Sequence, residues 1–184
     1  MHRVLVLLAQ GCEEVEAVTP IDILNRAGVE VVTASLDEDK VIKASHGAIL
    51  MAERQLSEVL DEDFDMVVLP GGLPGADYLG NDTRVVNLIK EMAQKGKYVC
   101  AICAAPRILA RNGLLKGKTA TAYPGILKQD EYPDTKIVDE KVVVDGNIIT
   151  GRGPGVAMDF ALALVEVLEG KEVRNKVEAS LVRY

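Results

Sequence analysis

The chain has 184 residues, 48% of them hydrophobic, and a formal net charge of −7 from 28 acidic and 21 basic side chains. This length predicts one domain, residues 1–184, with a sizeable core. No basic cluster could neutralise phosphates, which argues against nucleic acid as an obligate partner. No apolar run approaches the roughly 18 residues of a membrane span, so no membrane partner is expected.

The first residues of the chain and its cysteine count indicate the cellular compartment in which the protein is found. Residues 1–8 are basic and then apolar, but they run into Glu13 and Glu14, which favours a first strand over a signal peptide. Three cysteines are an odd number, so a disulfide scaffold is not expected. We therefore expect a cytoplasmic protein. Neither metal-ligand spacing nor a nucleotide fingerprint is found, so we expect no cofactor and no metal.

Apolar runs that alternate with helical periodicity predict a doubly wound α/β domain with a parallel sheet. The predicted strands are residues 3–8, 29–34, 66–69, 98–102 and 119–122. Hairpins are expected over residues 41–51 and 138–150. The predicted helices cover residues 13–27, 82–95, 104–111, 156–168 and 172–179. Ligands of such sheets lie at the carboxyl ends of the strands, so three loops qualify as site walls: those after residue 8, after residue 69 and at Cys103.

The central feature of the sequence is the strand 98–102, which meets Cys103 and turns at once into a helix. Small neighbours, Ala101, Ala104 and Ala105, leave room for such a sharp turn. The pattern is that of a nucleophile elbow, which presents its central residue at the edge of the sheet. A thiol at a helix N-terminus is expected to have a lowered pKa. The alternative interpretation is a buried core cysteine.

Carboxylates gather where the first helix begins, at Glu13, Glu14 and Glu16. Helix capping is the simple interpretation for all three, because the helix dipole favours negative charge there. Glu16 differs, because its loop borders the same sheet edge as Cys103. A carboxyl buried beside that thiol would have a raised pKa and would stay protonated, donating a hydrogen bond to sulfur.

A glycine turn follows the strand 66–69 and ends in Gly71 and Gly72. It lets the backbone approach closely and offers N–H groups to an anion. Together with the N–H of Ala104 it would form an oxyanion hole beside Cys103. The alternative is an ordinary tight turn.

Only two histidines are available as a general base. His2 lies at the far end of the first strand from Cys103. His46 lies in a hairpin turn, where a solvated side chain is the simpler interpretation. A Cys-His-Asp/Glu triad therefore has one weak candidate base, unless a partner chain supplies another.

The sequence gives less reason to expect a functional role for the other two cysteines, Cys12 and Cys100. Cys100 and Cys103 match C-x-x-C, but Cys100 lies inside a strand and faces the opposite side, so a redox disulfide is not expected. Cys12 follows the first strand at the site edge and is either buried or a second reactive thiol.

Four separated blocks occur in order: AQGCEEVE at 9–16, VVLPGG at 67–72, AICA at 101–104 and RGPG at 152–155. Together they resemble the ThiJ/PfpI superfamily, and within it the branch of the parkinsonism-associated protein deglycase and the bacterial chaperone YajL. The resemblance implies a flavodoxin-like doubly wound sandwich, similar to class I glutamine amidotransferases, with helices on both faces of a mostly parallel sheet. It also implies a homodimer.

The resemblance assigns roles to four residues. Cys103 becomes the nucleophile and the redox-sensitive cysteine, and Glu16 the protonated carboxyl beside it. Gly72 and Ala104 become the backbone donors. The implied activities are cofactor-free conversion of methylglyoxal to lactate, repair of glycated proteins, oxidation of the cysteine to sulfinate, and chaperoning.

Gly71, Pro154, Tyr123 and His46 are expected to line the pocket, and two of them depart from the family pattern. The human-type deglycase has a histidine where this chain has Tyr123, which cannot act as an ordinary base near neutral pH. It has an arginine where this chain has His46. Peptidase-like members carry a histidine directly after the nucleophile, where this chain has Ala104, which disfavours a peptidase or amidase.

The leading hypothesis is therefore a cofactor-free glyoxalase or deglycase in stress protection, acting on methylglyoxal-type dicarbonyls or on their protein adducts. The alternative is a redox-sensing chaperone in which Cys103 is oxidised to sulfinate.

Overall fold

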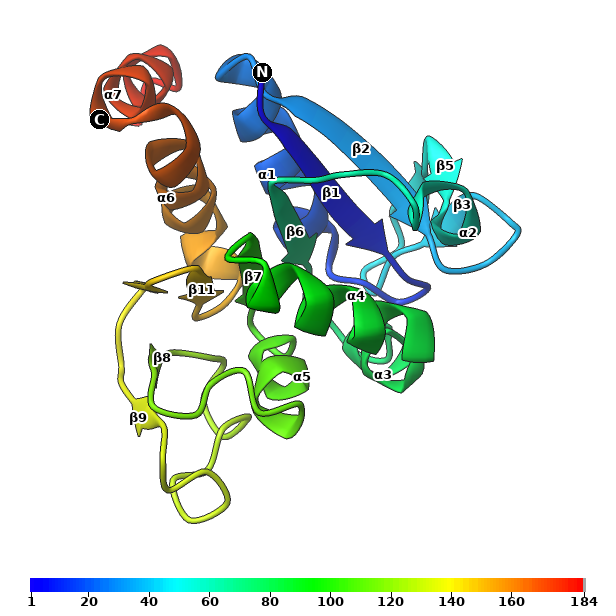
Figure 1. Ribbon diagram of the computed structural model, residues 1–184. Coiled ribbons are helices and arrows are strands. Elements are labelled where there is room, and N and C mark those ends of the chain that lie inside the picture. The colour runs from blue at the N-terminus through cyan, green and yellow to red at the C-terminus, as the bar shows by residue number, and fades with distance from the viewer. Residues whose placement is uncertain (184) are drawn as a thin grey trace.

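A seven-stranded sheet runs through the molecule in the strand order β10-β11-β7-β6-β1-β2-β5 (Figure 1). The computed structural model describes residues 1–183. All neighbouring strands pair in parallel except β10 and β11, which form an antiparallel hairpin. The strands are β1 (Arg3–Leu8), β2 (Glu30–Ser35), β5 (Arg54–Gln55), β6 (Met66–Leu69), β7 (Tyr98–Ile102), β10 (Val142–Asp145) and β11 (Ile148–Gly151). The predicted doubly wound, flavodoxin-like fold is confirmed.

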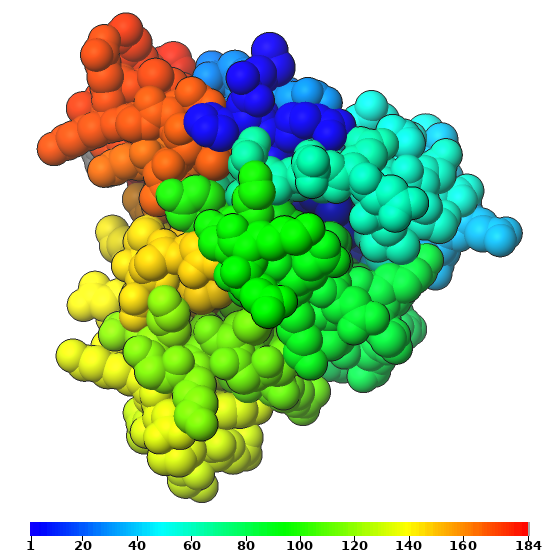
Figure 2. All heavy atoms as spheres, in the orientation of Figure 1, coloured from blue at the N-terminus to red at the C-terminus, as the bar shows by residue number. Residues whose placement is uncertain are grey.

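Helices cover both faces of this sheet. One face carries α1 (Glu14–Arg26), α6 (Ala157–Glu169) and α7 (Lys171–Ser180). The other face carries α2 (Leu56–Val59), α3 (Gly75–Asn81), α4 (Thr83–Gln94) and α5 (Pro106–Arg111). In the space-filling view of this second face, the green segment that includes α4 covers the middle of the sheet (Figure 2).

Strand β1 shows how one strand serves two cores. Val4, Val6 and Leu8 pack with the α1 and α6 side chains, whereas Leu5 and Leu7 pack on the opposite face. This alternation follows from the two-residue period of a strand. Burial of each such side chain stabilises the fold by about 1.5–3 kcal/mol, which explains why the strand is apolar throughout.

Two smaller sheets complete the fold. The antiparallel hairpin of β3 (Val41–Lys43) and β4 (Ile49–Met51) matches the first predicted hairpin. Strands β8 (Thr119–Ala120) and β9 (Lys136–Ile137) pair in parallel in a segment that extends from the main sheet (Figure 1). The predicted strand 119–122 is therefore shorter than expected. Among residues 1–183, none of the helices has the length and apolarity that crossing a membrane requires.

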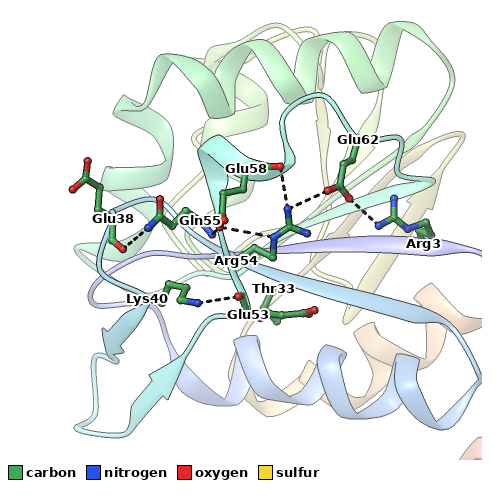
Figure 3. A network of polar contacts seen from close by, with 9 residues as sticks. All are labelled: Arg3, Thr33, Glu38, Lys40, Glu53, Arg54, Gln55, Glu58 and Glu62. Atoms are coloured by element: carbon green, nitrogen blue, oxygen red, sulfur yellow. Dashed lines mark hydrogen bonds and ion pairs between the residues drawn. The ribbon is translucent and has the colours of Figure 1, made fainter.

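The edge strand β5 is held by polar contacts rather than by a long ladder (Figure 3). Arg54 reaches the Glu58 carbonyl at 3.2 Å and the Glu62 carboxylate at 3.3 Å. Glu62 also accepts from Arg3 of β1 at 2.9 Å. The sequence predicted neither β5 nor α2, because their few residues carry no periodic pattern.

Two further differences lie near the site. The helix expected over residues 104–111 begins at Pro106, because residues 103–105 form a turn and proline is well suited to a first helical position. The sequence also missed α3, whose glycines are poor helix formers. Gly80 of α3 allows close packing, since a Cβ there would lie 3.3 Å from the Ile108 side chain.

Candidate active site

Cys103 lies at the carboxyl end of β7 in a left-handed backbone conformation, with φ of 66°. This conformation is strained for a residue with a Cβ atom. Hydrogen bonds on both sides hold it: the Cys103 N–H donates to Gly151 O, and the Tyr123 N–H donates to Cys103 O, each at 2.9 Å. The half-buried thiol is thus presented at the sheet edge, as the sequence predicts for an elbow.

The Glu16 side chain is completely buried on α1 and lies at the same edge. A Cβ atom added to Gly71 would lie 2.8 Å from both Glu16 Oε1 and Cys103 Cβ, so the carboxyl and the cysteine flank the same glycine. Neither carboxyl oxygen has a well-formed hydrogen-bond partner among the described residues. The Cys103 thiol and the Gly71 N–H are still close enough to affect its ionisation.

Burial raises the pKa of Glu16 to about 8, against smaller opposing effects of the Cys103 thiol and the Gly71 N–H. The carboxyl therefore carries its proton at neutral pH, the state that the sequence predicts. The expected lowering of the Cys103 pKa is wrong. Burial and then the charge of ionised Glu16 raise it to about 12, and the helix that was to lower it begins only at Pro106.

These two values describe one coupled pair. The pKa of about 12 applies when Glu16 already bears its negative charge, so it belongs to the loss of the second proton. The first proton leaves the pair with a pKa of about 8. The single negative charge that remains can reside on the sulfur of Cys103 with Glu16 protonated, which is the nucleophilic form.

Backbone donors favour that form. The N–H groups of Ala104 and Gly72 both act to lower the Cys103 pKa, so they lie where they stabilise negative charge on or near its sulfur. Gly72 has φ of 84°, and a Cβ atom there would lie 2.4 Å from Glu13 N. Only glycine allows the turn after β6 to approach the loop after β1 this closely.

The two other carboxylates of this loop are structural. Glu13 caps α1 by accepting from the Glu16 N–H at 2.9 Å. Glu14 accepts from the backbone N–H of His46 at 3.0 Å and of Ala48 at 3.3 Å, which ties the β3–β4 turn to α1. The His46 side chain is 73% exposed, with Nδ1 3.6 Å from Glu13 Oε1. Its predicted solvation is confirmed, but this side chain does not line the hollow that holds two of the other predicted pocket residues.

The predicted pocket residues Tyr123 and Pro154 line one hollow of about 330 Å³, together with Arg152 and the residues that follow it. Tyr123 is half exposed, and its backbone is the one bonded to Cys103 O. Gly151, whose carbonyl accepts the hydrogen bond from the Cys103 N–H, could not be identified from the sequence. Its place at the end of β11, beside β7, becomes apparent only from the strand order.

The remaining cysteines are not placed to react. Cys12 and Cys100 are fully buried, and burial raises the pKa of each thiol. No disulfide joins the three. A larger hollow of about 400 Å³ lies by Gln10, Asp37 and Tyr78 and includes none of the predicted site residues. The strained backbone, the two donors and the shared proton instead coincide at Cys103.

A cysteine on a strained elbow, in a flavodoxin-like sheet and beside a buried protonated carboxyl, defines a class of α/β proteins with a reactive thiol. Residues 2–167 match the DJ-1/PfpI family, and the chain belongs to this family. This confirms the family that the four sequence blocks indicated.

Relatives are similar over almost the whole chain. Protein dj-1beta of Drosophila melanogaster is 41% identical, over 98% of this chain and 97% of its own length. Glutathione-independent glyoxalase DJR-1.2 of Caenorhabditis elegans is 33% identical, over 94% and 91%. The structure of oxidized DJ-1 from Toxoplasma gondii superposes with a TM-score of 0.94 at 39% identity and covers 100% of both chains.

Proposed function

We propose that this protein is a cofactor-free glyoxalase that converts methylglyoxal-type dicarbonyls to hydroxy acids in stress protection. The observation that carries the proposal is the coupled pair of Cys103 and Glu16 beside two backbone donors: the pair loses its first proton with a pKa of about 8 and shares the proton that remains. The name of the nematode relative, a glutathione-independent glyoxalase, supports the same chemistry.

In the first step, the Cys103 thiolate adds to the aldehyde carbon of methylglyoxal. A carbon–sulfur bond forms, and the carbonyl electron pair moves to the oxygen. The N–H groups of Gly72 and Ala104 stabilise this oxyanion. Protonated Glu16 then gives its proton to the oxygen and becomes a carboxylate, leaving a neutral hemithioacetal.

In the second step, the Glu16 carboxylate removes the hydrogen of the former aldehyde carbon as a proton. The electron pair forms a double bond between the two carbons, and the oxygen of the neighbouring carbonyl takes up the hydroxyl proton of the first carbon. Glu16 then returns its proton to the second carbon, and the oxygen on the first carbon becomes the carbonyl of the thioester. The first carbon is oxidised and the second reduced by the same two electrons, so no external oxidant is required. Water then cleaves the lactoyl thioester to lactate and the free thiol.

The test is lactate formation from methylglyoxal by the metal-chelated protein and by Cys103→Ser and Glu16→Gln. We expect turnover in the wild type and loss of it in both variants. A fully folded wild type that forms no lactate would contradict the proposal.

The same steps would release a hydroxy acid from a hemithioacetal or hemiaminal on a protein, which defines the deglycase form of the proposal. Tyr123 and Pro154 line an open hollow, which suits a substrate attached to a larger molecule. Release of lactate from a freshly glycated peptide, faster than its spontaneous reversal to free methylglyoxal, would separate deglycation from glyoxalase activity.

A redox-sensing chaperone is the second candidate, and the unpaired Glu16 carboxyl favours it. When protonated, this group can donate a hydrogen bond to one oxygen of a Cys103 sulfinate and so favour that oxidation state. Intact mass after mild peroxide should then show a gain of two oxygens that Cys103→Ser lacks. Suppression of client aggregation by the oxidised form alone would establish this role.

We also propose a homodimer. Val15 and Val18 of α1 and Ile49 and Met51 of the neighbouring hairpin are 43–72% exposed, and such apolar side chains are typical of an interface. Sedimentation should show a dimer that Met51→Lys weakens.

A further inference from the structure

A cavity of about 170 Å³ lies between α3 and α5 and includes Ala104, the residue after the reactive cysteine. Helix α3 contributes Asp77, Gly80 and Asn81 to its wall, and α5 contributes Arg107 and Arg111. A Cβ atom at Gly80 would lie 3.3 Å from the Ile108 side chain. The missing side chain of this glycine therefore lets α3 and α5 pack closely beside the cavity.

Two arginines give this cavity its chemistry. Arg107 and Arg111 are four residues apart on α5, so their side chains project from the same side of the helix and repel each other. Asp77 compensates Arg107 through an ion pair of 2.9 Å. Arg111 has no carboxylate within ion-pair distance among residues 1–183 that the structure describes. One positive charge in the wall is thus left over, in a chain of net charge −7.

We propose that this cavity binds a compact oxyanion, a carboxylate or phosphate group, carried by the substrate that Cys103 attacks. Arg111 supplies the uncompensated charge, and the planar guanidinium fork suits the two oxygens of such a group. The Asn81 side chain adds a neutral donor. The role of this anion as part of a substrate rests on the proposed function, whereas binding of the anion to the cavity does not depend on it.

The position of the cavity explains why an anionic substrate would bind more tightly beside Cys103. Ala104 belongs both to its wall and to the pair of donors that face Cys103. A dicarbonyl whose distal end carries a carboxylate would anchor that end between α3 and α5. Methylglyoxal has no such group and would react without this anchor.

Binding is tested first, without turnover. Phosphate and succinate are titrated separately against the isotope-labelled protein, and the Ala104 amide and Arg111 Nε–H resonances are followed. We expect saturable shifts with at least one anion, at least about fivefold weaker in Arg111→Gln, as for loss of one charged hydrogen bond. Lys90→Gln, an exposed α4 residue with the same charge change, should bind as the wild type. Linear shifts, or equal affinity in Arg111→Gln, would overturn the site.

The substrate role is tested by kcat/KM for dioxovalerate, a dicarbonyl with a terminal carboxylate, against its methyl ester. We expect the acid to be preferred by the wild type and the preference to fall about fivefold in Arg111→Gln. Lys90→Gln, which lies outside the cavity, should keep both the preference for the acid and the methylglyoxal turnover of the wild type. Absence of all turnover would contradict the proposed function and leave the binding result standing, whereas equal use of acid and ester would overturn the substrate role alone.

Discussion

Glu14 and Glu16 are two residues apart on the first turn of α1, yet they are in opposite chemical situations. Partial burial opposes ionisation of Glu14, but hydrogen bonds from its own N–H and from those of His46 and Ala48 outweigh it and lower its pKa. Glu16 has no well-formed partner among the described residues, and the nearby Cys103 thiol and Gly71 N–H do not outweigh burial, which raises its pKa to about 8. The comparison shows that available donors, rather than the helix dipole that both residues share, decide which carboxyl stays ionised.

The largest loss of activity is expected from a change at Cys103, which lies beside Glu16 and not beside Glu14. Only Glu16 lies beside Cys103, and Cys103→Ser should reduce lactate formation at least roughly a thousandfold, because the alcohol is a far weaker nucleophile at neutral pH. The steady-state rate with methylglyoxal measures this. Cys12→Ala should retain the activity that its folded fraction allows, since Cys12 is fully buried. Equal losses in the two variants would point to a general effect on folding.

The second prediction concerns stability against pH. Folded Glu16 holds its proton up to about pH 8, whereas unfolded glutamate loses it near 4.5. The wild type should therefore lose stability as pH rises from 5 to 8, by up to roughly 4 kcal/mol. Glu16→Gln should remove this slope and be relatively more stable at pH 8. Denaturant unfolding at several pH values measures both proteins.

Glu14→Gln is the matched control for that slope. A lowered pKa stabilises the folded state above the unfolded pKa, and this stabilisation is lost as pH falls. Glu14→Gln should therefore destabilise the protein at neutral pH. The variant should still lose stability between pH 5 and 8 as the wild type does, because Glu16 is unchanged. A flat profile in wild-type protein would show that Glu16 is ionised when folded.

A smaller effect is expected from the turn that brings the donors to the pair. Gly72→Ala should cost about 2–4 kcal/mol, because the new methyl would lie 2.4 Å from Glu13 N at φ of 84°. Gly125→Ala has the same φ with no atom within 4 Å, and should cost only about 1 kcal/mol of backbone strain. Equal costs in denaturant unfolding would show that close approach does not shape the site.

The smallest effect is expected at Tyr123. Its backbone N–H, rather than its phenol, is bonded to Cys103 O. Tyr123→Phe keeps the backbone and the ring, so kcat for methylglyoxal should stay within about twofold of the wild type. A loss of tenfold or more would show that the phenol takes part in proton transfer and that Glu16 is not the sole acid and base.

Much of this arrangement could be predicted from the sequence, for physical reasons. The apolar strands around Cys103 and the small residues beside it specify an elbow, and a carboxyl at the start of α1 must approach the same sheet edge. The sign of the Cys103 pKa shift could not be predicted, because it depends on how much water the folded site excludes. Helix α3 was missed because its glycines lower the propensity and only packing against α5 stabilises it.

The proposed mechanism depends on a proton that Glu16 carries at neutral pH beside Cys103. Infrared difference spectra between wild type and Glu16→Gln measure this directly, because a protonated carboxyl has a carbonyl band that a carboxylate lacks. We expect the band at pH 6. Above about pH 8, the part of the band that remains measures the fraction of the pair that holds a Cys103 thiolate beside a protonated Glu16. A band that is already absent at pH 6 would mean that Glu16 is ionised, and would contradict the shared proton on which the mechanism depends.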